Sequence, residues 1–184
     1  LTYAGSPGRL TLIEDENALT QGFVSDVPQR ARIVERLTEL WNYERYGIPF
    51  KKGGKYFYFK NDGLQDHAVL YVTDALDAEP RVLVDPNTLS EDGTIALAEV
   101  SVSDDRRYLA YGLSDGGSDW RTWYVRDVAT GEDLDDEVEW SKFSGAAWLP
   151  DSSGFYYSRF DEPEDVLEEV NLDPKLFFDA VGTP

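Results

Sequence analysis

The sequence contains no cysteine and only one histidine among its 184 residues. Without cysteine, the chain can form neither a disulfide nor a thiolate metal site. The single histidine, His67, has no second histidine with which to build a metal cage, and we expect a structural role for it on a strand. We therefore expect no cofactor and no bound metal.

Basic residues are scarce, since 17 Lys and Arg stand against 36 Asp and Glu and the formal net charge is -19. Such a chain repels phosphate backbones and anionic lipid surfaces, so we expect neither nucleic-acid nor membrane partners. No apolar run approaches membrane-spanning length, and no signal peptide is visible. The acidity is typical of a well-solvated surface, and adaptation to high salt is the alternative.

Signatures of a catalytic centre are also missing. There is no Gly-x-Ser-x-Gly nucleophile elbow, and Ser103 and Ser118 are distant in sequence from the histidine. We therefore expect no Ser-His-Asp triad within this chain. Residues 112–117 are rich in Gly but lack the Lys of a phosphate-binding loop. Paired acids such as Asp135 and Asp136 are expected by chance in so acidic a chain and do not indicate a glycosidase.

The N-terminal part has the apolar spacing of helices. Residues 12–24 form one such segment, and a second begins after Pro28 and ends near Asn42. After Tyr43 the periodicity changes to two, which is typical of strands. We predict a helical lead-in over residues 1–43 and a β-rich part over residues 44–184.

The β-rich part contains apolar and aromatic runs joined by short turns. The predicted strands are residues 55–60, 68–73, 81–84, 98–102, 108–112, 122–128, 145–149, 154–159 and 176–180. No helical crossover separates them, which favours an antiparallel meander over a parallel α/β sheet.

A repeat is visible within these strands. A turn at Asp105 followed by an aromatic strand recurs 46 residues later at Asp151, and a fainter copy surrounds Gly53. Repeats of about 40–50 residues with about four strands each are typical of β-propeller blades. We predict blades 1 and 2 and the start of blade 3, and therefore an incomplete domain and a fragment of a longer protein.

Several longer motifs resemble those of prolyl oligopeptidases. They are residues 36–43 (RLTELWNY), 46–50 (YGIPF), 56–65 (YFYFKNDGLQ), 83–94 (LVDPNTLSEDGT), 109–114 (LAYGLS), 117–120 (GSDW), 138–148 (VEWSKFSGAAW) and 175–178 (KLFF). The resemblance runs from about Ile13 to the end of the chain. Residues 1–10 do not show the Asp-Pro-Tyr-x-Trp-Leu-Glu block with which the family usually begins.

This resemblance implies a seven-bladed β-propeller that caps an α/β-hydrolase domain. It further implies a serine endopeptidase that cleaves short peptides after proline through an acyl-enzyme. The triad would lie in the C-terminal hydrolase domain, which this sequence lacks, so we expect no catalytic residue here and no activity from this chain alone. The implied partners are short proline-containing peptides and that hydrolase domain. We expect a cytoplasmic location, with the periplasm or secretion as alternatives.

The resemblance also implies roles for particular residues. Phe143 corresponds to a position that lines a substrate pocket, and packing in the core beside Trp148 is an equal alternative. Asp119 corresponds to a position at the domain interface with a gating role, although a simple turn acid beside Trp120 is favoured. Residues 161–173 correspond to a mobile loop that helps to gate the active site.

Two other functions are possible for a propeller-like chain. One is a non-catalytic module that binds peptides. The other is a propeller enzyme with acidic active-site residues, such as a sialidase, which the spacing of the acids does not support.

Overall fold

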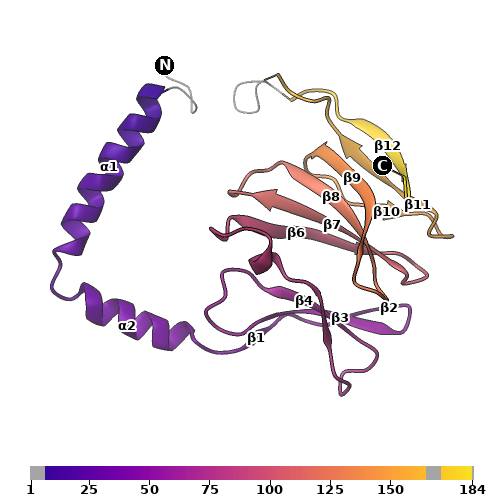
Figure 1. The fold of residues 1–184 in the computed structure, drawn as a ribbon, viewed down its shortest axis with the longest axis horizontal. Coiled ribbons are helices and arrows are strands. Elements are labelled where there is room, and N and C mark those ends of the chain that lie inside the picture. Colours follow the sequence, from indigo (N-terminus) through magenta and orange to yellow (C-terminus); the bar gives the residue numbers. More distant parts are fainter. Residues whose placement is uncertain (1–6, 165–170, 184) are drawn as a thin grey trace. The chain divides into compact units, whose positions relative to one another are not determined.

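The computed structural model describes residues 7–164 and 171–183. The chain divides into two compact units, of which one carries the two helices and the other carries the strands (Figure 1). The predicted gating loop, residues 161–173, falls in part on residues 165–170, which lie outside the described residues. None of the described helices combines the length and apolar character needed to cross a membrane.

The helical unit contains α1 (Pro7–Ser25) and α2 (Arg30–Trp41). Helix α1 begins earlier than its apolar spacing predicts, and α2 begins two residues after Pro28. The apolar residues of α2, such as Ile33, Leu37 and Leu40, are exposed within the described part of the chain. The hydrophobic core therefore lies in the strand unit.

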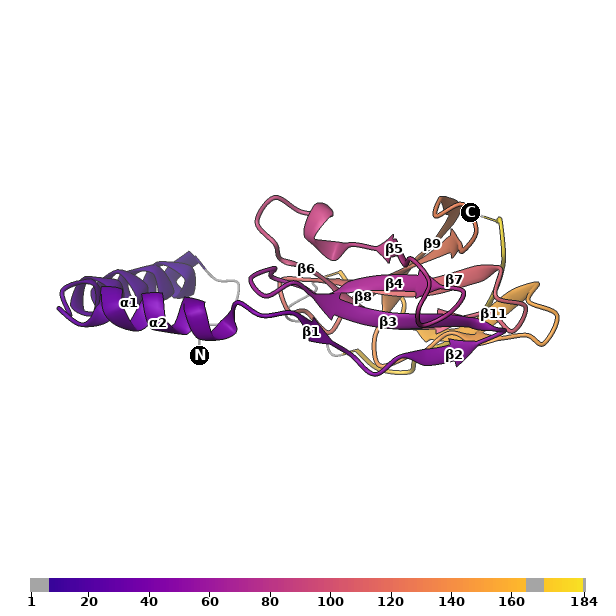
Figure 2. The ribbon, with the colours of Figure 1, turned by 90° about the horizontal axis from the view of Figure 1, so that it is seen from below.

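Three sheets make up the strand unit and follow one another in chain order, as Figures 1 and 2 show. Sheet A contains β1 (Arg45–Tyr46), β2 (Phe50–Lys52), β3 (Lys55–Asn61), β4 (Val69–Thr73) and β5 (Arg81–Val84). A short 3-10 helix, η1 (Pro86–Thr88), lies in the connection to sheet B. Sheet B contains β6 (Ile95–Val102), β7 (Tyr108–Asp115), β8 (Arg121–Asp127) and β9 (Asp133–Ser141). Sheet C contains β10 (Ala147–Trp148), β11 (Gly154–Arg159) and β12 (Lys175–Ala180).

Every strand pairing among the described residues is antiparallel, which confirms the predicted mainly-β fold with N-terminal helices. Three strands were absent from the prediction, namely β1, β2 and β9. Strand β9 was not predicted because its sequence, DLDDEVEWS, is dominated by acids. Its buried residues are Asp136, Val138 and Ser141, so it lacks the apolar run that marked its neighbours.

The repeat at Asp105 and Asp151 is a repeat of turn geometry. Each carboxylate accepts a hydrogen bond from the backbone N–H two residues later, at 3.0 Å for Asp105 and 3.1 Å for Asp151. The intervening residues, Arg106 and Ser152, are both left-handed, with φ of 63° and 59°. Both turns therefore use the same side-chain-supported conformation to join the first two strands of their sheets.

These turns also link neighbouring sheets. The backbone N–H of Asp105 donates to Ser152 Oγ at 3.3 Å, and the Arg106 guanidinium donates to the carbonyl of Gly53. Gly53 and Gly54 form the β2–β3 turn, and both have the positive φ that a two-residue hairpin of this type requires. The first turns of the three sheets thus lie at the same end of the stack.

Two apolar clusters hold the sheets together. One lies between sheets A and B and includes Phe57, Leu70 and Leu109. The other lies between sheets B and C and includes Trp123, Val125 and Phe155. Sheet B therefore contributes buried side chains to both clusters and is covered on both faces.

A pair of carboxyl groups lies beside the second cluster. Asp136 of β9 is 2% exposed and accepts hydrogen bonds from the N–H of Gly182 at 2.8 and 3.0 Å. Asp179 of β12 lies beside Asp136, and its Oδ2 is buried with no hydrogen-bond partner among the described residues. Burial and the neighbouring Asp136 carboxylate raise the pKa of Asp179 to about 6. One proton is therefore held between sheets B and C in mildly acidic solution.

We predict that Asp179→Asn increases stability at neutral pH. The folded pKa lies above that of an unfolded aspartate, so stabilisation by the protonated carboxyl is complete below about pH 4 and is lost as the pH rises through about 6. The amide mimics the protonated form, so the gain in unfolding free energy at pH 7.5 is roughly 1–2 kcal/mol after allowance for partial exposure. Urea unfolding at pH 4.5, 6.0 and 7.5 measures it.

The matched control is Asp77→Asn, because Asp77 is exposed in the β4–β5 connection. This variant should follow the parent at each pH. If the unfolding free energies of Asp179→Asn and of the parent changed in parallel from pH 4.5 to 7.5, the raised pKa of Asp179 would be ruled out.

Candidate functional site

Two chain segments leave sheet B at the same end. Arg121 at the start of β8 pairs with Ser141 at the end of β9. The residues just before Arg121 and just after Ser141 therefore lie beyond the same end of the sheet. These segments contain Asp119 and Phe143, so the structure brings both predicted site residues to one end of sheet B.

A bulge in β9 turns its last residues away from regular pairing. Between the pairs Trp123↔Val138 and Arg121↔Ser141, β9 has one residue more than β8. Trp140, in this bulge, is left-handed with φ of 60°. Bulges commonly re-aim a side chain at the rim of a sheet. Here the bulge places the Trp140 ring edge-on to Trp120, with ring centroids 5.6 Å apart and planes at 90°.

Trp120 is the centre of an aromatic cluster that consists of Trp120, Trp140 and Phe160. The Phe160 ring also meets Trp120 nearly perpendicularly, with 5.9 Å between centroids. Edge-to-face pairs of this kind contribute about 0.5–1.5 kcal/mol each beyond the area that they bury. The Trp120 backbone N–H donates to Ser118 Oγ at 3.1 Å, which fixes its loop. The cluster thus joins the loop before β8, the end of β9 and the segment after β11.

Phe143 is presented to solvent by a strained backbone. It is 76% exposed, and its φ of 52° is left-handed. This conformation costs on the order of 1–3 kcal/mol in a bulky residue and is concentrated at functional sites. Trp148, beside which Phe143 was alternatively expected to pack, contacts Tyr108 and Phe155.

Buried serines hold both sides of this segment. Ser141 Oγ donates to the carbonyl of Ser158 at 2.9 Å and accepts from Trp123 Nε1 at 3.2 Å. Ser144 Oγ accepts from the backbone N–H of Ser158 at 2.7 Å. Phe143 is therefore the exposed residue of a segment that is bonded to β11 on both sides.

Lys142 fills the position between the bulge and Phe143. Its Nζ lies 3.7 Å from the centroid of the Trp120 ring, which is a close cation–π contact. The sequence alone did not predict this contact. The pairing of β8 with β9, which brings Trp120 near Trp140, would have indicated this contact, but β9 had not been predicted.

Asp119 is exposed in the loop before β8. Among residues 7–164 and 171–183, its carboxylate has neither a hydrogen-bond partner nor a counter-ion. It therefore does not cap a turn, and it remains available to an outside partner. The nearby ion pair between Arg121 and Glu99, at 2.5 Å, belongs to the sheet itself.

His67 lies in a bend just before β4 and not on a strand as expected, and its contacts are with the backbone and with Asn87. Its Nε2 lies 2.7 Å from the carbonyl oxygen of Gly93, and its backbone N–H donates to Asn87 Oδ1 at 2.9 Å. Within the described ranges, no three His, Asp or Glu side chains are grouped as a metal would require.

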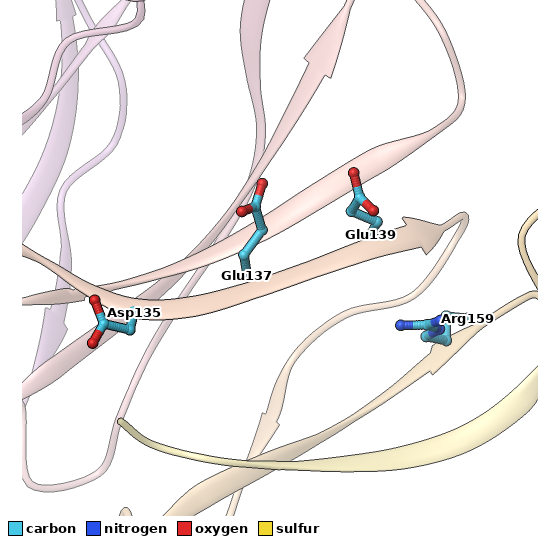
Figure 3. A pocket seen from close by; sticks show the side chains of 4 residues that line it. All are labelled: Asp135, Glu137, Glu139 and Arg159. Carbon is cyan, nitrogen blue, oxygen red and sulfur yellow. The ribbon is translucent and has the colours of Figure 1, made fainter. Parts of the chain in front are cut away.

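An open pocket of about 360 Å³ lies between residues of β9 and β11. Figure 3 shows Asp135, Glu137 and Glu139 on β9 and Arg159 on a neighbouring strand. Glu137 also accepts a hydrogen bond from the Tyr124 hydroxyl at 3.0 Å, so part of this acidic row is committed to the sheet. The lining is charged, unlike the apolar lining of most small-ligand pockets.

Comparisons with known proteins all indicate one family. The model of the prolyl oligopeptidase N-terminal β-propeller domain matches residues 7–184. The prolyl endopeptidase of Elizabethkingia meningoseptica is 42% identical over 174 residues, which are 93% of this chain and 24% of that protein. The prolyl endopeptidase of Elizabethkingia miricola is 39% identical over 173 residues, with the same two shares of 93% and 24%.

Solved structures agree with the sequence relatives. One from a study of two prolyl endopeptidases superposes with a TM-score of 0.89 at 28% identity, covering 97% of this chain and 27% of that one. Prolyl oligopeptidase B from Galerina marginata, bound to a 35mer hydrolysis and macrocyclization substrate, gives a TM-score of 0.77 at 31% identity over 90% of this chain and 26% of that one. This chain thus spans about a quarter of the length of these relatives.

We predict that Ser141→Ala destabilises the fold by about 2–4 kcal/mol, because it leaves the buried Trp123 N–H and the Ser158 carbonyl without partners. Urea unfolding measures the loss. Ser153→Ala is the control, since Ser153 is exposed in the β10–β11 turn. That change should cost less than about 1 kcal/mol, and equal losses in the two variants would contradict the anchoring role of Ser141.

Proposed function

Because the chain belongs to the prolyl oligopeptidase family, as part of its N-terminal β-propeller domain, we propose that it is the substrate-filtering part of a proline-specific serine endopeptidase. The whole protein hydrolyses short peptides after proline through an acyl-enzyme. Its triad is supplied by an α/β-hydrolase domain outside this chain. The three sheets are the first blades of the propeller that covers that domain.

The observation that carries this proposal is the presentation of Phe143. An exposed aromatic ring on a left-handed residue is favoured neither by burial nor by its backbone, so its retention calls for a partner. A proline-containing peptide offers a flat apolar ring that can stack on it. In this proposal Phe143 lines the substrate pocket, and the Asp119 carboxylate, which has no partner among the described residues, lies at the interface with the hydrolase domain.

The state of His67 supports placing the chemistry elsewhere. A serine nucleophile needs an adjacent base, and histidine is the usual one. The one histidine of the chain is already hydrogen-bonded to Gly93 beside β4. Filtering and pocket lining therefore remain as the roles of this part of the protein.

The first prediction concerns activity. We expect no hydrolysis of a Gly-Pro amide by the isolated chain, and turnover by the full-length protein. A Gly-Pro ester should release a burst of its leaving group before steady state, because the acyl-enzyme accumulates. Hydrolysis by the isolated chain would show that the triad is assigned to the wrong part. Peptide binding without turnover by the full-length protein would favour a non-catalytic binding module.

The second prediction concerns Phe143→Ala in the full-length protein. Loss of a fully covered Phe contact costs about 1.5–3 kcal/mol, so kcat/KM for a proline-containing peptide should fall roughly tenfold or more, mainly through KM. The control is Leu76→Ala, which removes another exposed apolar side chain, from the β4–β5 connection near the β2–β3 turn. Equal values of kcat/KM for Phe143→Ala and Leu76→Ala would contradict the placement of Phe143 in the substrate pocket.

A further inference from the structure

We propose that Lys142 and Trp120 form a clamp that positions Phe143, and that the clamp helps to determine specificity for the peptide. This inference rests on the proposed function and names two positioning residues for it. Neither is required to touch the substrate, because both act through the direction of the Phe143 ring.

The clamp bridges two segments that sheet B brings together. Lys142 follows β9 and Trp120 precedes β8, and the Arg121↔Ser141 pair joins their strands. At 3.7 Å from the ring centroid, the ammonium group of Lys142 lies within the range in which an indole face attracts a cation. The upstream neighbour of Phe143 is thereby fixed to a different segment of the chain.

The Trp120 ring is held so that one face is available to Lys142. Its contacts with Trp140 and Phe160 are perpendicular, with planes at 90° and 88°. Its indole N–H is buried and has no acceptor in the described parts of the chain. A buried donor without a partner is unfavourable, so the position is not explained by hydrogen bonding. It is explained by the ring face, which is the strongest among side chains for a cation.

Phe143 needs fixed points on both sides. On its downstream side, Ser144 is bonded to the backbone of Ser158. On its upstream side, the clamp restrains Lys142. If the clamp is lost, the left-handed φ of 52° can relax to the extended region, which a bulky residue prefers. The Phe143 ring would then point in another direction, and the fraction of protein molecules in which it can contact the peptide would fall.

The test uses full-length protein and a double-mutant cycle. Lys142→Met keeps most of the length and the apolar character of the stem but removes the charge. We expect KM for a proline-containing peptide to rise about three- to tenfold with kcat nearly unchanged, as loss of a partly desolvated cation–π contact predicts. Lys142→Arg retains the cation and should restore a KM close to that of the parent.

Trp120 gives a graded version of the same test. Trp120→Phe keeps a ring with a weaker face and should raise KM less than Trp120→Leu does. The matched control is Lys51→Met, because Lys51 makes a cation–π contact with Tyr56 in sheet A, 4.9 Å from the ring centroid. That variant should leave KM unchanged. Should Trp120→Leu fail to fold, the Lys142→Met and Lys142→Arg pair decides the question.

Phe143→Ala closes the cycle. If Lys142 acts through Phe143, Lys142→Met/Phe143→Ala should have the KM of Phe143→Ala alone. The clamp would be overturned if the KM increases of the two single variants multiplied in the double variant. It would also be overturned if Lys142→Met had a normal KM while Phe143→Ala had a raised one. Both results would leave the pocket role of Phe143 intact. A normal KM for Phe143→Ala would instead overturn the proposed role of Phe143, and with it the clamp.

Discussion

Burial of sheet B on both faces is the constraint on which the rest of the strand unit depends. Leu109 and its neighbour Ala110 are both fully buried, the first against sheet A and the second against sheet C. Because successive side chains of a strand point to opposite faces, this burial fixes the register of β7 and commits both faces to packing. Only the sheet edges and the loops at the two ends remain for binding. The location of Asp119 and Phe143 at one end follows from this packing.

The sequence predicts those parts of the fold whose physics is local. The turn at Asp105 was predictable because its carboxylate supports its own turn, and the same arrangement recurs at Asp151. Strand β9 was not predictable in that way. Its backbone is strand-like because β8 pairs with it, and its acids are tolerated because alternate ones point outward. Buried Asp136 shows that even the inward positions are not all apolar, since hydrogen bonds from Gly182 satisfy it.

The candidate site also combines features that the sequence predicts with features that arise only from tertiary contacts. Phe143 could be selected from its motif, but its exposure and left-handed backbone follow from tertiary anchors. The bulge at Trp140 is a single extra residue of β9 in its pairing with β8. Because β9 was not predicted from the sequence, the bulge could not be predicted either. Lys142 and Trp120 are 22 residues apart in sequence, so their contact exists only because that register and the bulge bring them together.

The unfavourable features of sheet B are unequally distributed between its two ends. At the end with the β6–β7 turn, the left-handed Arg106 is flanked by Asp105, whose carboxylate satisfies the local backbone. At the opposite end, around the Arg121↔Ser141 pair, are left-handed Trp140 and Phe143, the exposed Asp119 and a buried Trp120 N–H with no acceptor among the described residues. Packing alone would favour neither the strain nor the exposed ring. Since stability in such a fold is a small difference between large terms, the concentration of these costs at one end is consistent with the binding role proposed for Phe143, while the other end joins the sheets.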